Sequence, residues 1–318
     1  MNLAMLVGQK SGLPAYYRKL PGNITDVSTL KTTIETLDFL GKEKLRFVLD
    51  SGFYSESNVD ALLNKRYQFI LKVPAGRIWI RDILDRYYEK AASPESYRKT
   101  GDNEVLYMAS HLHMWKGRRC YIHLYYNASK AAEDFDNLMG KLVACKKDLE
   151  TGNRKSAHNE LYERFFTIRE TPKRGLSVNY DDAEIQKYRK RYAGFFCIMT
   201  NVKMDSGELL NIYRGKESIE KCFDDLKNGL DMKRLRIHSS EAMESRLFIQ
   251  FLALVFINSI RIIAKSDVKL QYMSAREIIE AMETIVLITY SGRYGHTVSE
   301  IGPLQKYIID VFELPYVS

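Results

Sequence analysis

The chain is poor in the residues that mark small stapled or repetitive proteins. Its 318 residues include only four cysteines, 18 glycines and seven prolines. No cysteine lies close enough to another to form a zinc knuckle or a Cys-x-x-Cys site. The low glycine and proline contents exclude collagen-like and proline-rich classes. The N-terminal segment MNLAMLVGQK has no basic region of the kind that begins a signal peptide, so we expect a reduced, cytoplasmic protein.

The composition is that of a globular protein with an excess of basic residues. Hydrophobic residues make up 45% and charged residues 28% of the chain, and the length allows one large domain or two ordinary ones. The formal net charge of +8 is compatible with a polyanion as partner. The apolar run over residues 247–264 approaches the length of a membrane span, but Gln250, Asn258 and Arg261 interrupt it. We therefore expect a core helix of a soluble domain and no membrane partner.

Apolar runs and turn residues predict an α/β fold. Two β-prone runs, 3–7 and 15–20, predict a hairpin, and a helical pattern follows Asp26. The short apolar segment 45–49 predicts a buried strand that ends at Asp50, and strands are also predicted over 68–73 and 195–199. These segments divide the chain into an α/β core in two pieces, residues 1–75 and 191–270. An α+β insertion, 76–190, interrupts the core, and a helical tail, 271–318, follows it.

Two groups of residues are candidates for chemistry. Asp50 follows a strand of the parallel, buried type, and ligand sites of open α/β sheets lie at that end of the strands. The alternative is that Asp50 only caps a turn, because Asp-Ser-Gly is common turn chemistry. The second group is Tyr213, Lys216, Glu220 and Lys227, which occupy an arc of about 60° if residues 209–227 form one helix. The alternative there is a solvated face with alternating charges.

Taken together, these features resemble the DDE transposases of bacterial insertion sequences, in the superfamily with a Tyr-Arg-Glu-Lys signature. The segment YRGKESIEKCFDDLKNGLDMKRLRIHS, residues 213–239, carries the most specific part of the resemblance. The resemblance implies a ribonuclease-H-like mixed sheet. It matches Asp50 to the second acid of the family's triad and Glu220 to the third. Tyr213 and Lys227 match the signature's Tyr and Lys, and Lys216 stands where the signature has Arg.

The resemblance also implies a reaction, a cofactor and partners. The reaction is metal-dependent cleavage and strand transfer at insertion-sequence ends, within a synaptic complex that a homodimer forms. Asp50 and Glu220 would hold two Mg²⁺ ions, for which Mn²⁺ can substitute, because Mg²⁺ prefers carboxylate oxygens. DNA phosphates would contact Tyr213 and a set of cations: Lys216, Lys227, Lys233, Arg234 and Arg236.

The sequence departs from the family at the first acid, which the family carries on a strand ahead of the hairpin. The aspartates that precede Asp50 are Asp26, at a predicted helix start, and Asp38, within that helix. We therefore expect an N-terminally truncated or split transposase that lacks its first strand, with a complementary N-terminal fragment as a further partner. Two alternatives stay open: a non-catalytic product that binds DNA or transposase and inhibits transposition, and a decayed remnant.

Overall fold

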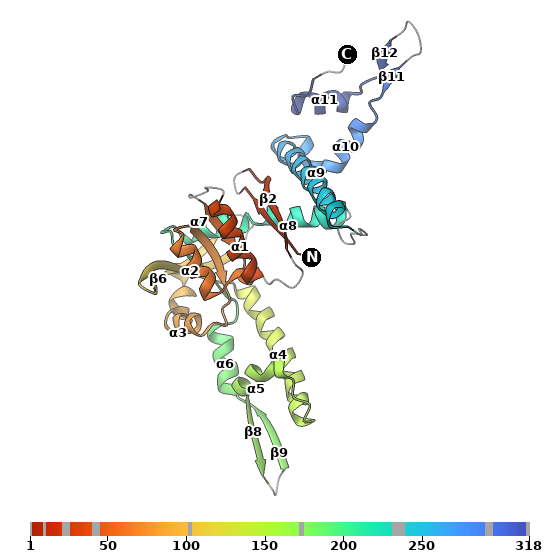
Figure 1. Cartoon of the computed structure of the whole chain (residues 1–318). Coiled ribbons are helices and arrows are strands. Elements are labelled where there is room, and N and C mark those ends of the chain that lie inside the picture. Colours follow the sequence, from red (N-terminus) through yellow and green to blue (C-terminus); the bar gives the residue numbers. More distant parts are fainter. Residues whose placement is uncertain are drawn as a thin grey trace. The chain divides into compact units, whose positions relative to one another are not determined.

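The computed structural model describes residues 2–8, 11–20, 26–39, 45–100, 104–171, 175–230, 239–289 and 295–315. The chain forms two compact units (Figure 1). The larger unit is Thr25–Arg214, and the smaller unit joins Met1–Ile24 to Gly215–Ser318. The domain boundaries predicted from the sequence differ from this division and stay a prediction.

A six-stranded mixed sheet forms the centre of the larger unit, which confirms the mixed α/β class. Its order is β3-β4-β10-β7-β6-β5. β3 and β4 run parallel, and the other neighbours are antiparallel. The strands are β3 (Arg46–Leu49), β4 (Gln68–Val73), β5 (Tyr97–Lys99), β6 (Val105–Trp115), β7 (Arg118–Tyr126) and β10 (Phe195–Thr200).

Helices cover both faces of this sheet. α7 (Ser206–Arg214) packs Leu209 and Leu210 on one face, against a cluster that includes Ile70 and Ile198. α3 (Ile78–Ala91) contacts the opposite face of β6, where Trp79 stacks on His113. This unit also contains α1 (Asp26–Phe39), α2 (Glu56–Asn64) and the 3-10 turns η1 (Ser51–Phe53) and η2 (Pro94–Ser96).

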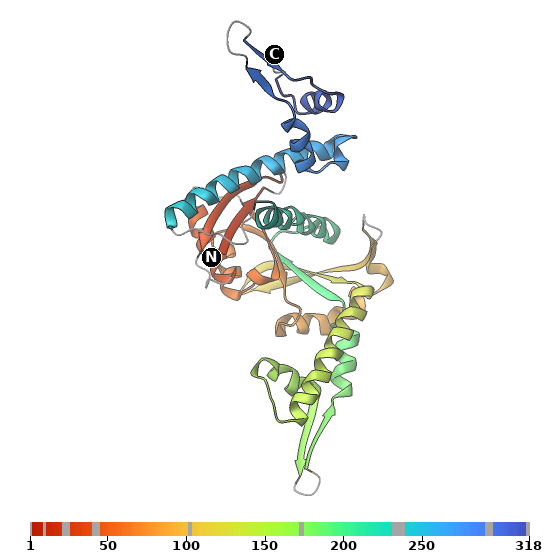
Figure 2. The same cartoon turned by 90° about the vertical axis from the view of Figure 1, so that its right-hand side faces the viewer.

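A helical extension with its own core follows β7. It consists of α4 (Ala128–Glu150), η3 (Ser156–His158), α5 (Asn159–Phe165), β8 (Phe166–Thr171), β9 (Gly175–Tyr180) and α6 (Asp182–Arg191). Leu142, Phe165 and Ile185 are buried together in it. The β8–β9 hairpin lies at the end of the extension away from the sheet (Figures 1 and 2). Strands β5, β6 and β7, which fall within the insertion predicted over 76–190, belong to the same sheet as β3 and β4.

The smaller unit contains the predicted hairpin and the helical C-terminal part. β1 (Asn2–Val7) and β2 (Pro14–Leu20) pair antiparallel as a sheet of their own. α9 (Ser240–Ser266) runs along this hairpin (Figure 2), and Met5, Cys222 and Leu254 are buried together. The other elements are α8 (Glu217–Asp224), the π-helical turn η4 (Asp225–Gly229), η5 (Leu270–Tyr272), α10 (Ala275–Glu283), β11 (Leu287–Thr289), β12 (His296–Val298) and α11 (Pro303–Val311).

α9 contains the apolar run that the sequence singled out. Among the described residues it is the one helix long and apolar enough to cross a membrane, and 28% of its most apolar stretch is buried. Gln250 donates a hydrogen bond to the Leu230 carbonyl, and Arg261 pairs with Asp225 at 2.8 Å. These contacts join α9 to Leu230 and Asp225 of the same unit. The assignment as a core helix of a soluble domain stays a prediction.

Candidate active site

Asp50 lies at the carboxyl end of β3, on the side of the sheet that α7 covers. Side chains alternate along a strand, so Asp50 shares a side with Val48, which packs in the α7 cluster. Asp50 Oδ1 accepts a hydrogen bond of 2.7 Å from the backbone N–H of Ser51 and caps η1. Asp50 therefore does cap a turn, as the alternative interpretation predicted. Its side chain is also half-buried at the end of a strand.

Tyr213 approaches the same carboxylate from α7. Its hydroxyl donates a hydrogen bond of 2.9 Å to Asp50 Oδ1. The ring is buried among Ile70, Met108 and Leu210, which fixes the direction of the hydroxyl. One carboxylate oxygen thus receives two donors from different elements, and this restricts the rotation of the Asp50 side chain.

α7, which presents Tyr213, is held to the sheet at its N-terminus. Ser206 Oγ lies 2.8 Å from His123 Nδ1, and the Ser206 carbonyl accepts a 2.8 Å hydrogen bond from the Tyr125 hydroxyl. His123 is buried on β7, and desolvation lowers the pKa of its imidazole to about 4. The imidazole is therefore neutral at pH 7 and able to hydrogen-bond the Ser206 hydroxyl in either role.

An ion pair holds the other end of α7. Arg214, adjacent to Tyr213, pairs with Glu104, just ahead of β6. Asn127 Nδ2 also donates to Glu104 Oε1, at 2.8 Å. The last turn of α7 is thus tied to the loop before β6 and to the start of α4, and the position of Tyr213 is set from both sides.

Lys216, Glu220 and Lys227 lie in the smaller unit. Lys216 Nζ is 3.3 Å from Glu220 Oε1, and the Glu220 side chain is exposed. Lys227 is exposed on η4. The single helix predicted over 209–227 is instead divided into α7, a turn at Gly215, α8 and η4. Glycine has a low helix propensity, and the i→i+5 bonds of η4 change the helical phase, so the common face of all four residues stays a prediction.

The structure describes both predicted metal ligands but not all of the predicted DNA contacts. Asp50 belongs to the larger unit and Glu220 to the smaller one. Within the described ranges, no three His, Cys, Asp or Glu side chains form a group that could hold a metal ion. Both residues offer carboxylate oxygens, the donors that suit Mg²⁺. The predicted DNA contacts Lys233, Arg234 and Arg236 lie outside the described residues.

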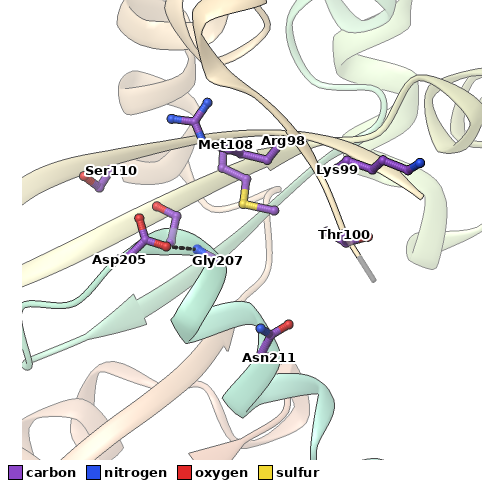
Figure 3. A pocket seen from close by; sticks show the side chains of 9 residues that line it. Arg98, Lys99, Thr100, Met108, Ser110, Asp205, Gly207 and Asn211 are labelled. Atoms are coloured by element: carbon purple, nitrogen blue, oxygen red, sulfur yellow. Dashed lines mark hydrogen bonds between the residues drawn. The ribbon is translucent and has the colours of Figure 1, made fainter. Parts of the chain in front are cut away.

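A polar hollow of about 360 Å³ opens at the N-terminus of α7 (Figure 3). Asp205 Oδ1 accepts from the Gly207 N–H at 2.7 Å and caps the helix there (Figure 3). The N–H bonds of the cap lower the pKa of Asp205. Neither Asp50 nor Tyr213 is among the residues that line this hollow. Its lining includes Arg98, Lys99, Thr100, Met108, Ser110 and Asn211.

Sequence reasoning missed the residues that hold α7. His123 lies 83 residues from Ser206, and Glu104 lies 110 residues from Arg214. Neither pair falls within a helical or strand repeat, so no local pattern indicates it. The partners meet only because β6, β7 and α7 pack in one unit.

Comparison with known proteins identifies the family. The sequence model of the family described as "Transposase DDE domain" matches residues 1–256. No curated protein and no solved structure is significantly similar to the chain. The match covers most of the chain, including Asp50, α7 and α8, and the chain belongs to the family of transposases with a DDE domain.

Proposed function

We propose that this chain supplies two acids of the catalytic centre of an insertion-sequence transposase, built on a ribonuclease-H-like core. The reaction is cleavage of DNA at the element's ends and transfer of the freed strand to a target. The hydrogen bond from Tyr213 to Asp50 is the observation that supports it most. It joins the Tyr of the signature segment to the acid at the end of β3.

In this proposal Asp50 and Glu220 are the metal ligands. Two divalent ions, when bound, activate the attacking oxygen and stabilise the leaving oxygen. The chain's own residues prepare the ligands. Ser51 and Tyr213 orient Asp50 through Oδ1. Lys216 Nζ lies 3.3 Å from Glu220 Oε1 and limits the directions that this carboxylate takes.

DNA is the proposed substrate, and the cations of the signature segment are its proposed contacts. Lys216 and Lys227, with Lys233, Arg234 and Arg236, would position the phosphate backbone without reading sequence. Lys216 is a point charge in the place of the signature's Arg, so it cannot grip a phosphate with the two parallel bonds of a guanidinium. A homodimer that pairs two element ends is the proposed assembly, in the cytoplasm.

The proposal leaves one acid of the triad to be supplied from elsewhere. Asp26 begins α1 and Asp38 lies within it, so neither is the residue at the end of a described strand, as Asp50 is. β3 pairs with β4 alone within the described part of the chain. We therefore expect no cleavage by this chain alone. A strand that carries the missing Asp has to join it, in the same polypeptide or as a separate fragment.

The test is restoration of activity. A strand with an Asp, followed by a short linker, is fused ahead of Met1, and cleavage of a labelled element end is measured with Mg²⁺ and Mn²⁺. The fusion is expected to cleave, and Glu220→Gln is expected to abolish cleavage by removing an anionic ligand. Asp224→Asn, on the same helix, is the matched control and should retain activity. Cleavage by the unfused chain, or cleavage that survives Glu220→Gln, would contradict the assignment.

The alternative function, a non-catalytic inhibitor that binds DNA or transposase, predicts a different outcome. The fusion would then bind element ends as the unfused chain does, yet neither would cleave them. The unfused chain would lower cleavage by an active transposase when the two are mixed.

A further inference from the structure

Exposed cations gather at the end of the six-stranded sheet opposite Asp50. They come from three connections: the end of α2, the β6–β7 turn and the segment after β10. We call this set the basic rim, and its members are Lys65, Arg66, Lys116, Arg118, Arg119 and Lys203.

Strand register shows that the three connections share one end of the sheet. Arg46 pairs with Gln68 where β3 and β4 begin, whereas Asp50 follows the other end of β3. Asn201 reaches that beginning, because its side chain accepts from the Phe69 N–H at 3.0 Å and donates to the Tyr67 carbonyl at 2.9 Å. Lys203 is two residues further on.

The β6–β7 turn lies at the same end. Arg118 Nη2 donates to Asn64 Oδ1 at 2.7 Å, which ties the turn to the last residue of α2. Lys65 and Arg66 follow Asn64 directly. The three connections thus lie at one end of the sheet, and four residues of β3, about 13 Å, separate that end from Asp50.

Nearby acids neutralise only part of the rim. Asp60 pairs with Lys116 at 2.6 Å and accepts a further bond from the Trp115 indole. Asp205, near Lys203, is turned toward the N-terminus of α7. Glu56 is a third acid whose charge acts on Lys116. Without counting Lys65, five rim cations outnumber these three acids, which leaves an excess of positive charge among the described residues at this end of the sheet.

Two rim cations occupy backbone positions that favour other residues. Arg66 has φ of 59°. The Arg66 and Tyr67 N–H groups bond the carbonyls of Leu63 and Leu62. This is the helix ending in which glycine is preferred.

Lys116 has φ of 46° and forms with Gly117 the two-residue loop between Trp115 and Arg118. Asparagine is favoured at that position. A charged side chain at a position where the backbone favours Gly or Asn points to a role for the charge.

We propose that the basic rim binds the phosphate backbone of duplex DNA, at a site separate from the Asp50 end. Half of its members are arginines, whose planar guanidinium matches phosphate oxygens better than ammonium does. The inference rests on the proposed function only in that DNA is the substrate, and it is independent of the metal ligands and of catalysis.

The two backbone positions provide a sharp experiment. The double variant Arg66→Gly/Lys116→Asn removes two charges while relieving two strained φ angles, so its thermal midpoint should equal or exceed that of the unchanged chain. Lys141→Gln/Lys147→Gln on α4 removes the same charge elsewhere and is the matched control. Affinity for a random-sequence duplex is measured by fluorescence anisotropy over a range of salt concentrations.

The rim variant should lose about tenfold in affinity at about 0.1 M salt, and its log–log salt slope should fall by about 1.8, which corresponds to two lost phosphate contacts. The control should change neither value appreciably. Unchanged DNA affinity in the rim variant would overturn the inference. If Lys227→Glu weakened binding in the same assay, the proposed substrate would still stand.

Two further outcomes would show that the basic rim does not bind DNA. Loss of binding to phosphatidylserine vesicles or to poly-glutamate, with DNA affinity unchanged, would assign the rim to a membrane or an acidic protein and overturn the inference. No DNA binding by the unchanged chain at low salt would overturn both the rim and the proposed substrate.

Discussion

The Tyr213 hydroxyl donates a 2.9 Å hydrogen bond to Asp50 Oδ1, across 163 residues of sequence. The sequence indicates Asp50 as a site residue because it follows a predicted strand, and Tyr213 because it belongs to the signature segment. The bond connects the end of a sheet strand to the last turn of α7, and it fixes the orientation of the carboxylate. Such outer-shell contacts tune metal ligands in many sites.

Under the proposed role of Asp50 as a metal ligand, replacing Tyr213 by Phe should weaken metal binding without unfolding the chain. The ring would keep its packing against Ile70 and Leu210. Loss of the hydroxyl should lower the free energy of unfolding by about 1 kcal/mol and Mn²⁺ affinity by about tenfold. Urea denaturation and Mn²⁺ titration by electron paramagnetic resonance measure the two effects.

Tyr97→Phe is the control for that prediction, because Tyr97 is exposed on β5 and packs against Tyr107. It should change neither measurement. Equal Mn²⁺ affinity in Tyr213→Phe and the unchanged chain would show that Asp50 needs no orientation by the hydroxyl.

The ion pair between Arg214 and Glu104 should act through the same helix. Each side chain is about one-third exposed, so Arg214→Glu should cost only about 1 kcal/mol of unfolding free energy, including the new repulsion. The double variant Arg214→Glu/Glu104→Arg restores opposite charges and should recover part of that loss. A double-mutant cycle by urea denaturation measures the coupling.

A coupling energy indistinguishable from zero would show that the ion pair between Arg214 and Glu104 does not stabilise the position of α7. Arg214→Glu should also lower Mn²⁺ affinity, because it loosens the helix that presents Tyr213. The matched control is Arg164→Glu in the helical extension, where Arg164 and Glu184 meet at 2.7 Å, and it should leave that affinity unchanged.

Local patterns predicted much of the fold. Strand 68–73 coincides with β4, and the expected hairpin is β1–β2. Both carry strong short-range signals, an apolar run and a glycine-containing loop. The single helix over 209–227 was wrong, because its amphipathic pattern continues through Gly215 while the backbone does not.

The site was predictable only one residue at a time. Asp50 follows a strand, and Tyr213 belongs to a signature segment, so each could be named. Their bond depends on how α7 docks on the sheet, through Ser206 and Arg214. Those contacts join residues far apart in the chain, and the spacing of apolar and polar residues within one helix or strand does not predict them.

Gly194 should tolerate no side chain. Its φ is +77°, and an added Cβ would lie 2.5 Å from the Asn127 carbonyl oxygen and 2.6 Å from Ala131 Cβ. Both contacts involve the start of α4, so neither partner can move easily. Gly194→Ala should destabilise the chain by about 3 kcal/mol or more, as measured by urea denaturation.

Gly152→Ala separates the backbone effect from the clash. Gly152 has φ of +72°, but nothing lies within 4 Å of its added Cβ. It should therefore show only the left-handed backbone penalty of about 1 kcal/mol. Equal losses in the two variants would mean that the close approach of Gly194 to α4 contributes nothing.

His123 should make the stability of the larger unit depend on pH. Burial lowers the pKa of its imidazole from 6.5 to about 4, although the charge of Asp205 opposes the shift. Between these pH values the unfolded chain binds more protons than the folded one. The free energy of unfolding should therefore fall as the pH drops from 6.5 to 4, by up to about 3 kcal/mol from this group. Urea denaturation at several pH values measures the slope.

Histidine variants isolate this contribution. Burial also lowers the pKa of His111 and His113, so the unchanged chain carries their share of the slope as well. His123→Gln removes only the buried group on β7, and its stability should depend less on pH between 4 and 6.5, whatever its stability at pH 7. If His123→Gln kept the slope of the unchanged chain, the imidazole would have to be protonated in the folded chain, and its contact with Ser206 Oγ would be a bond donated by a charged ring.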